Sequence, residues 1–367
     1  MIPVLDVGAS YSEIAAEVDA AVKGVLSSGW YIGGEAVETF EREFAAYCGA
    51  AHGVGTGNGL EALALSLRAL AVGKGDEVIV PANTYIATWL AVSMVGAVPV
   101  PVEPDPATHC IDPARIEAAI TPRTRCIMPV HLYGHPCAME AIMRIARAHN
   151  LLVVEDAAQA HGAAWQGEKI GRHGDAVAWS FYPTKNLGAF GDAGAVTTDN
   201  ADVANRIRLL RNYGSRDKNV HEVKGFNSRL DPVQAAILSV KLRHLDAWQR
   251  RRQVIADLYA DGFTGLNSAI APATAPGATH AWHLYVMRFD RRDEVAASLN
   301  SQGVASAVHY PTPPFRQAAY PEFAADALHW PLSDEIARTV LSIPMGPHLS
   351  TDDAGRVIDA VHRAVGG

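Results

Sequence analysis

Residues 180–194, SFYPTKNLGAFGDAG, place a single lysine, Lys185, among aromatic, small and glycine residues. No other side chain between residues 177 and 191 carries a full charge. Enclosure in apolar surroundings lowers the pKa of a lysine, and the neutral amine is the form that attacks a carbonyl carbon. The stretch therefore predicts that Lys185 forms a Schiff base. The plain alternative is a loop lysine whose ammonium group extends to water.

The composition is that of a large globular protein. The chain has 367 residues, of which 49% are hydrophobic and 19% charged, and this length predicts a main domain with a smaller partner. A formal net charge of −8 without any basic run argues against nucleic acid as a partner. Cysteines without CxxC spacing are typical of a reducing cytoplasm. No secretory signal is expected, because the N-terminal stretch MIPVLDVGAS lacks a basic region and an apolar core. No membrane span is expected, because the longest apolar run, residues 90–102, is broken by prolines.

A glycine-rich stretch at residues 52–59, HGVGTGNG, precedes a run of leucine and alanine that predicts a helix over 60–70. Turns that open a helix bind phosphate through free backbone N–H groups. Asn58, Gly59 and Leu60 are therefore candidate phosphate donors, although an ordinary turn explains the stretch equally well. The spacing does not complete GxGxxG, which weakens a nicotinamide-dependent oxidoreductase as an alternative.

Short apolar runs alternate with helical segments between residues 77 and 155. This alternation predicts an α/β fold whose mostly parallel sheet is covered by helices on both faces. Ligands of such sheets bind beyond the carboxyl ends of the strands. The residues expected there are Asp156 and Gln159 after LLVVE, Ser180 after AVAWS, and the segment 84–89 after EVIVPA.

Three of these features together fit pyridoxal 5′-phosphate. This cofactor needs a lysine for its aldehyde, a carboxylate that keeps its pyridine nitrogen protonated, and donors for its phosphate. Lys185, Asp156 and the turn at Gly59 supply these parts. Considered alone, Asp156 is well explained as the N-cap of the following helix.

The rest of the chain predicts helices around the sheet and a smaller α+β region. Helices are expected over 10–28 and 35–47, and a long helix is expected to start at Asp231-Pro232 and run towards residue 256. A strand near 283–289, a helix capped by Asp290, a strand near 304–309 and a last helix starting at Ser350 should follow. No spacing of histidine, cysteine or acidic residues indicates a metal site.

Several blocks of the sequence resemble the sugar-nucleotide aminotransferases of the DegT/DnrJ/EryC1/StrS family. The blocks are TYIATWLAV at 84–92, VHLYG at 130–134, VEDAAQAHGA at 154–163, SFYPTKNLGAFGDAGA at 180–195, RNYGS at 211–215 and GFNSRLDPVQAAI at 225–237. The resemblance implies the type I fold of pyridoxal-phosphate-dependent aminotransferases. Residues 1–240 would form a large cofactor-binding domain with a mostly parallel central sheet, and residues 241–367 a small α+β domain. It also implies a homodimer with shared active sites.

The resemblance implies roles for the cofactor-binding residues. Lys185 would be the Schiff-base lysine and Asp156 the partner of the pyridine nitrogen. Gln159 would lie near the phenolic oxygen of the cofactor, and Trp89 would stack on its ring. The phosphate would be held by Ser180, by the amides around Gly59 and Leu60, and by Asn227 of the neighbouring subunit. Asn58 stands where close relatives have serine, and its carboxamide can still donate a hydrogen bond to the phosphate.

The text after the lysine, KNLGAFGD, resembles the branch of the family that acts on 3-keto sugars. It implies that the enzyme aminates a dTDP-3-keto-6-deoxyhexose with L-glutamate as the donor. UDP-linked or 4-keto sugar nucleotides are the alternative substrates, and a non-catalytic regulator that keeps the cofactor pocket is the alternative of another class. Candidate substrate contacts are Tyr31, Tyr182, Arg216, Lys218, Arg229, His309 and Tyr310. The alternative for Tyr31, for the basic residues and for His309 is an ordinary structural or surface role.

Overall fold

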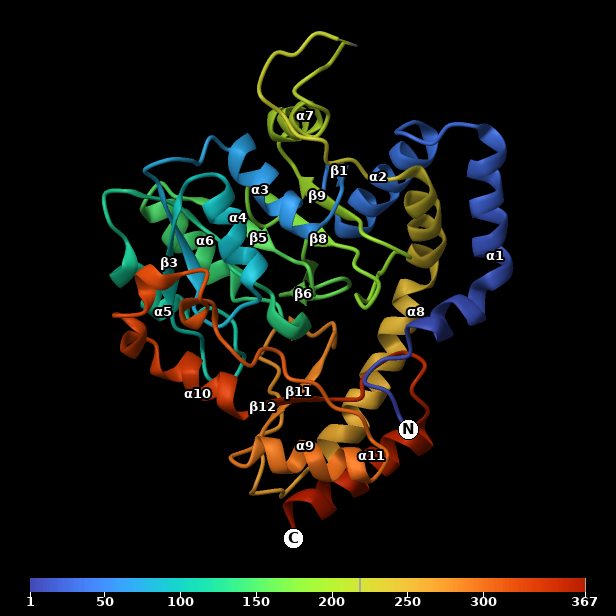
Figure 1. Cartoon of the computed structure of the whole chain (residues 1–367), viewed down its shortest axis with the longest axis vertical. Coiled ribbons are helices and arrows are strands. Elements are labelled where there is room, and N and C mark those ends of the chain that lie inside the picture. The colour runs from blue at the N-terminus through green and yellow to red at the C-terminus, as the bar shows by residue number, and fades with distance from the viewer. Residues whose placement is uncertain (218, 367) are drawn as a thin grey trace.

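The computed structural model describes residues 1–217 and 219–366 and is built around a seven-stranded sheet (Figure 1). The strand order is β1-β9-β8-β5-β4-β2-β3. All neighbouring strands from β8 to β3 run parallel, and β9 runs antiparallel to both β8 and β1. The predicted α/β fold with a mostly parallel sheet is therefore confirmed. The strands of this sheet are β1 (His52–Thr56), β2 (Glu77–Pro81), β3 (Val98–Val102), β4 (Thr124–Ile127), β5 (Leu152–Asp156), β8 (Ala176–Ser180) and β9 (Gly194–Thr198).

Helices cover both faces of this sheet, and each face has its own hydrophobic core. One core joins the sheet to α2 (Glu35–Cys48), α6 (Met139–Ala148) and the first half of α8 (Pro232–Gly262). The other joins it to α3 (Gly59–Ala69), α4 (Ile86–Met94) and α7 (Ala201–Leu210). Strands buried on both faces explain why the sequence shows continuous apolar runs rather than alternation. The helix α1 (Val7–Ser28) packs along α8 (Figure 1), and the short α5 (Pro113–Ile116) lies between β3 and β4 in the chain.

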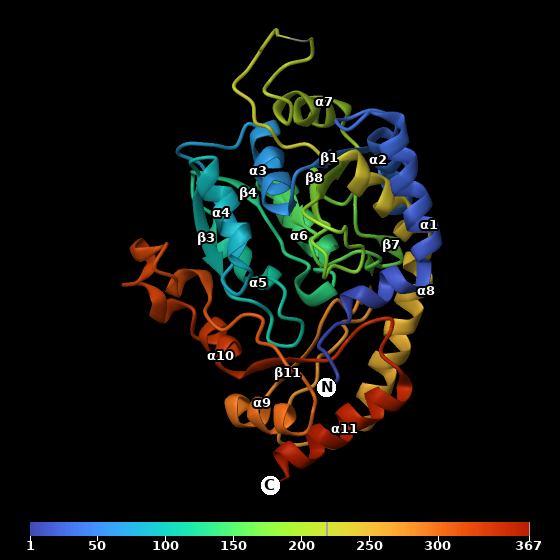
Figure 2. The ribbon, with the colours of Figure 1, turned by 45° about the vertical axis from the view of Figure 1, so that its right-hand side comes forward.

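The C-terminal part of the chain forms a third core on the second half of α8. It contains β11 (Tyr285–Arg288), β12 (Val340–Ile343), α9 (Arg292–Ser301) and α11 (Thr351–Val365), and Ile2 of the N-terminal segment packs into it. Figures 1 and 2 both show α8 passing from the sheet to this region. The boundary expected at residue 240 falls inside this continuous helix. The remaining elements are α10 (Pro331–Thr339), β6 (Ala164–Trp165), β7 (Glu168–Lys169) and β10 (Ala278–Thr279).

Three local expectations need correction. Residues 52–56 of the glycine-rich stretch form β1 instead of a turn. Gly53 and Gly55 are needed there because an added Cβ atom would lie 2.4 Å from the Glu41 carbonyl oxygen and 2.7 Å from Leu230 Cβ. The strand expected near 304–309 is reduced to single bridges, from Val304 to Ile2 and from Ala307 to Ser342 of β12. The helix expected after Asp290 has Arg291 as its N-cap, without a side-chain capping bond.

Among the helices within residues 1–217 and 219–366, none combines the length and the apolar character that crossing a bilayer requires.

Candidate active site

A cavity of about 570 Å³ opens at the carboxyl ends of β2, β4, β5 and β8. Its floor comes from the segments that directly follow these strands, and the N-terminus of α3 forms one side. The opposite wall comes from the C-terminal part of the chain, through His283, His309 and Tyr310. This is the place at which ligands of a parallel α/β sheet bind.

Lys185, the candidate Schiff-base lysine, projects from the loop after β8 into this cavity. Burial lowers the pKa of its amine to about 8, and the negative charge of Asp156 acts in the opposite direction. A substantial fraction of the side chain is therefore the neutral amine near pH 8. This is the form that attacks a carbonyl carbon.

The loop that carries Lys185 is fastened to one side of α8. The Asn186 side chain donates to Gln249 Oε1 at 2.9 Å, and the Phe190 amide donates to Gln234 Oε1 at 2.8 Å. Between them, the buried amine of Lys241 donates to the carbonyl oxygen of Gly188. The long helix therefore fixes the loop at three points along its length.

Asp156 ends β5 and lines the cavity with a buried carboxylate. Its oxygens accept from the Thr88 hydroxyl at 2.9 Å and from the Ala158 amide at 3.2 Å. Burial raises the pKa of Asp156, and these two donors lower it. The backbone is held as well, because Asp156 accepts from the His131 amide at 3.0 Å and donates to the Pro129 carbonyl at 2.8 Å. A protonated pyridine nitrogen would supply the strong donor that this buried anion lacks.

The N-terminus of α3 faces the cavity through Asn58, Gly59 and Leu60. Asn58 is the N-cap, and its side-chain oxygen accepts from the Glu61 amide at 2.9 Å. The amides of Gly59 and Leu60 donate to no other group in the described part of the chain. Ser180 lies directly opposite, since a Cβ atom on Gly59 would be 2.6 Å from Ser180 Cβ. Two free amides, a hydroxyl and a helix N-terminus form a suitable cradle for a phosphate group.

Gln159 connects the sheet side of the cavity to the C-terminal wall. Its Nε2 donates to the Tyr310 hydroxyl at 3.0 Å, and its Oε1 accepts from the Tyr133 amide. Tyr310 and His309 both line the cavity, as does the exposed Tyr182. Burial lowers the pKa of His309 to about 4, so its imidazole is neutral at physiological pH.

Trp89 does not reach the cavity, which corrects the stacking role implied for it. Its side chain is 0% exposed, its indole N–H donates to the Pro81 carbonyl, and its ring packs edge-on against Tyr320 and Phe323. The aromatic residue of this segment that lines the cavity is Tyr85, which is 54% exposed and whose ring centre lies 5.1 Å from that of Tyr310.

Sequence reasoning missed three further residues of the site, namely Tyr85, Thr88 and His283. A signal existed for the first two, because the segment 84–89 was expected at the end of a strand. The helical period separates Thr88, which faces Asp156, from Trp89, which faces the core. No sequence pattern indicated His283.

The remaining candidates lie outside this cavity in the single chain. Tyr31 is exposed and its hydroxyl donates to the Leu26 carbonyl. Arg229 donates to Asn212 Oδ1 at 3.1 Å, and Arg216 forms an exposed ion pair with Glu222 at 3.2 Å. Asn227 is exposed and likewise does not line the cavity. Lys218 falls outside the described residues.

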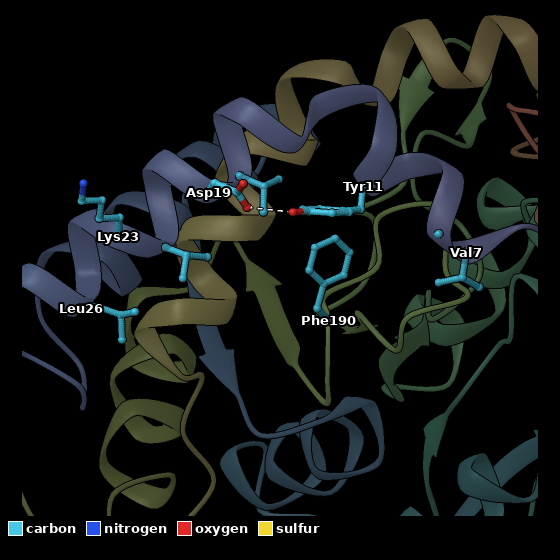
Figure 3. A pocket seen from close by; sticks show the side chains of 9 residues that line it. Val7, Tyr11, Asp19, Lys23, Leu26 and Phe190 are labelled. Carbon is cyan, nitrogen blue, oxygen red and sulfur yellow. Dashed lines mark hydrogen bonds between the residues drawn. The ribbon is translucent and has the colours of Figure 1, made fainter.

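A second hollow, of about 660 Å³, lies between α1 and the end of the lysine loop (Figure 3). It is lined mainly by apolar groups, including Leu26 and Phe190, and on its α1 side the Tyr11 hydroxyl donates to Asp19 at 3.0 Å. It has neither a phosphate cradle nor a buried titratable pair, so it has none of the features expected of the reaction site.

The residues of the cavity at the carboxyl ends of the parallel strands fit pyridoxal 5′-phosphate. The amine of Lys185, the buried carboxylate of Asp156 and the phosphate cradle at Gly59 and Ser180 all line one cavity. By contrast, the described residues contain no group of three or more histidine, cysteine or acidic side chains arranged to hold a metal ion.

Comparisons with known proteins identify the family of the chain. A family model for the DegT/DnrJ/EryC1/StrS aminotransferase family matches residues 12–362. A dTDP-3-amino-3,4,6-trideoxy-alpha-D-glucose transaminase from Streptomyces venezuelae is 52% identical, over 98% of this chain and 95% of its own. A protein from Saccharopolyspora erythraea named erythromycin biosynthesis sensory transduction protein EryC1 is 53% identical, over 97% of this chain and 98% of its own.

Among solved structures, a crystal structure of S. venezuelae DesV in complex with a ketimine intermediate superposes with a TM-score of 0.97. It is 52% identical and covers 99% of this chain and 98% of its own. The chain therefore belongs to the DegT/DnrJ/EryC1/StrS family and is a pyridoxal-phosphate-dependent aminotransferase.

Proposed function

We propose that the protein transfers an amino group from L-glutamate to a keto sugar nucleotide, and that this substrate is a dTDP-3-keto-6-deoxyhexose. The product would be the dTDP-3-amino-3,6-dideoxyhexose. The proposal rests on one observation, namely that Lys185, Asp156 and the phosphate cradle line the same cavity. The similarity to a dTDP-3-amino sugar transaminase over almost the whole chain supports the choice of substrate class.

Each residue of the site has a defined part in this reaction. When bound, the cofactor supplies an aldehyde for the amino group and a ring that accepts electron density. Asp156 keeps the ring nitrogen protonated, and Gly59, Leu60 and Ser180 hold the phosphate. Lys185 would anchor the cofactor through its aldehyde, and its neutral amine would be the base that takes up a proton from the reacting carbon of the substrate. The lowered pKa of its amine suits both tasks.

A panel of keto sugar nucleotides tests the substrate proposal. The purified enzyme, loaded with pyridoxal phosphate, is assayed with L-glutamate and with 3-keto or 4-keto sugars linked to dTDP or UDP. We expect the highest kcat/KM for the dTDP-linked 3-keto-6-deoxyhexose, and no turnover by Lys185→Ala. A higher kcat/KM for a UDP-linked or 4-keto sugar would move the assignment to that substrate.

The visible absorption spectrum separates an enzyme from a regulator, the class suggested by the name of the S. erythraea relative. A regulator that only binds the cofactor would show its visible absorption band but no change of that band on addition of L-glutamate. The intact set of Lys185, Asp156 and Gln159 supports the enzyme.

We further propose that the enzyme is a homodimer in which each cavity is completed by the partner chain. Among the described residues that line the cavity, Lys185 is the only cation, whereas Asp156 and Asp192 are both acidic. A phosphate, a nucleotide diphosphate and the carboxylates of glutamate all require more positive charge than this. Cationic and amide side chains do occur in the arm, which consists of residues 211–217 and 219–229.

The arm supports this proposal through its position. It follows α7 and extends beyond the sheet and its helices in both views (Figures 1 and 2). Its two sides are joined by bridges at Asn212–Asn227 and Ser215–His221. In the proposed dimer, Asn227, Arg216 and Arg229 of the arm contact the cavity of the neighbouring chain. Asn227 binds the phosphate of the cofactor there.

Complementation tests the shared site. Chains with Lys185→Ala are mixed with chains inactivated at Asn227, and the heterodimers are isolated with two different affinity tags. One cavity of each heterodimer then carries both lesions and the other carries neither. We expect activity to return towards the level of one intact site. If verified heterodimers stay inactive while both parent proteins remain folded, the assignment of Asn227 to the neighbouring chain's cavity is wrong.

A further inference from the structure

His283 is a buried histidine that lines the cavity and has no role in the account above. It lies two residues before β11 on the C-terminal wall and is 5% exposed. Its ring contacts the lysine loop, because Nδ1 lies 3.3 Å from Oδ1 of Asn186, the residue directly after Lys185.

The hydrogen bonds of Asn186 determine which ring nitrogen of His283 carries the proton. Asn186 Nδ2 lies 2.6 Å from the backbone carbonyl oxygen of Ala281 and 2.9 Å from Gln249 Oε1. A backbone carbonyl only accepts, so the amide nitrogen of Asn186 faces Ala281 and its oxygen faces His283. Since that oxygen also only accepts, Nδ1 of His283 must donate.

His283 carries a single proton. Burial holds the pKa of this imidazole well below its usual range, and the positive charges of Lys185 and Arg252 and the nearby His309 and His161 act in the same direction. With the proton on Nδ1, Nε2 keeps a free lone pair. Nε2 has no partner among the described residues and is not one of the fully buried unpaired polar atoms, so it opens onto the cavity.

The backbone around His283 is fixed from several sides. Arg252 donates to the carbonyl oxygens of Trp282 at 2.9 Å and of His283 at 3.4 Å. The Leu284 amide donates to the Tyr133 carbonyl at 3.2 Å. A Cβ atom on Gly134 would lie 2.9 Å from the His283 amide nitrogen, so the segment sits directly against the VHLYG turn. The lone pair on Nε2 is therefore held in a constant place.

We propose that Nε2 of His283 accepts a hydrogen bond from a hydroxyl group of the sugar ring and so selects the sugar substrate. This inference rests on the proposed function. A neutral ring that only accepts at the cavity matches a hydroxyl donor and repels the carboxylates of glutamate. The only donor of glutamate, its amino group, is the group that reacts. His283 is thus a specificity-determining residue for one of the two half-reactions.

Binding measurements on the cofactor-loaded enzyme test this role. The ligands are dTDP alone and the dTDP-3-amino-3,6-dideoxyhexose, and the variants are His283→Leu and His283→Gln. We expect His283→Leu to weaken binding of the sugar nucleotide about tenfold to a hundredfold, because a buried hydroxyl loses its acceptor. Binding of dTDP should change less than about twofold. His283→Gln, which retains an acceptor oxygen, should recover part of the loss.

Single-turnover kinetics supply a second measurement. With His283→Leu, conversion of the cofactor by L-glutamate should keep its rate within about threefold, while the return reaction with the keto sugar slows by the factor lost in binding. His280→Leu is the matched control. It changes a buried histidine of the same segment that does not line the cavity and whose ring stacks on Trp282 at 3.9 Å.

Sugar nucleotides that lack one ring hydroxyl complete the test. The wild-type enzyme should bind one of these analogues more weakly than the parent sugar nucleotide. His283→Leu should bind that analogue and the parent with equal affinity. The assignment would be overturned if His283→Leu lost equal affinity for dTDP and for the sugar nucleotide, or if its affinity for the sugar nucleotide were unchanged. A wild-type enzyme that aminates no keto sugar nucleotide would instead overturn the proposed function, and the wild-type assay shows this before any variant is compared.

Discussion

At Lys185 two effects on the pKa oppose each other, and a pH titration separates them. Burial lowers the pKa to about 8, while the Asp156 carboxylate raises it. We expect cofactor-free protein to capture pyridoxal phosphate with a pH midpoint near 8, read from the visible absorption band of the bound cofactor. Asp156→Asn should move this midpoint to lower pH, because the charge that stabilises the ammonium form is gone. A midpoint near that of an ordinary lysine would show that the side chain is solvated.

Asp156 and Thr88 should give graded effects on the rate. Asp156→Asn removes the anion that keeps the pyridine nitrogen protonated, and we expect kcat to fall on the order of a thousandfold. Thr88→Val removes only one hydrogen bond to the carboxylate, so a loss of about tenfold is expected. Steady-state kinetics on both variants, with cofactor content checked by absorbance, measure the two effects. Similar losses in both would contradict the ranking.

Residues whose chemistry and position in the chain are both distinctive could be predicted from the sequence. Asp156 was expected at the cavity because it follows an apolar strand, Lys185 was a candidate because it is the one charged residue in an apolar stretch, and Gly59 because it lies in a glycine-rich stretch that opens a helix. The stacking role was wrongly assigned to Trp89, because the sequence does not show whether Tyr85 or Trp89 faces the cavity. Packing of Trp89 against Tyr320 and Phe323 determines this. His283 could not be predicted, since it is brought to the cavity by contacts with residues about a hundred positions away.

At the level of the element, the start of α3 depends on the absence of a side chain at Gly59. A Cβ atom there would lie 2.6 Å from Ser180 Cβ and 3.1 Å from its Cα, so Gly59→Ala must push β8 and α3 apart. We expect a loss of about 1–3 kcal/mol in the free energy of unfolding and at least tenfold weaker cofactor binding. Urea denaturation and cofactor titration measure these.

Gly24→Ala is the matched control for this substitution. Gly24 lies within α1, and no atom lies within 4 Å of the place where its Cβ would be. Alanine is favoured over glycine in a helix, so this variant should gain about 0.5–1 kcal/mol. A loss of cofactor affinity in Gly24→Ala equal to that in Gly59→Ala would refute the local explanation.

The elements themselves were predicted to different degrees, for a physical reason. Helices with long apolar faces, such as α2 and α3, appear within one or two residues of the expected ranges. Residues 52–56 were taken for a turn because two of their five residues are glycine, whereas the glycines are required by close contact with α2 and Leu230. Contacts of this kind form only in the tertiary structure and cannot be recognised in the local amino-acid sequence.

For the whole molecule, buried histidines predict a loss of stability in mild acid. Burial lowers the pKa of His109 to about 4 and that of His161 to about 3, from an ordinary value of 6.5. The folded state keeps these rings neutral while the unfolded chain takes up protons below pH 6.5. Their effect is therefore absent above pH 6.5 and grows as the pH falls towards 4, by about 1.4 kcal/mol per pH unit and per histidine.

Urea denaturation at pH 7.5 and pH 5.5 measures this effect, and His161 offers a test of its origin. Neither ring nitrogen of His161 has a hydrogen-bond partner in the described part of the chain, and the ring lies among Phe44, Trp179 and Phe181. His161→Leu should therefore remove about 1.4 kcal/mol of the difference between the two pH values. An unchanged difference would assign the acid sensitivity to other groups.

The attachment of both cavity walls to α8 limits how the cavity opens. One side of this helix holds the lysine loop through Gln234, Lys241 and Gln249, and one turn further on Arg252 holds the segment of His283. Rotating the C-terminal part away from the sheet would have to bend or break this continuous helix, which carries contacts on both sides of the junction. Within the described residues, α8 therefore resists a hinge motion at the junction of the two parts. Entry and release of a nucleotide depend on segments that α8 does not hold, and the reacting groups keep their spacing while these segments move.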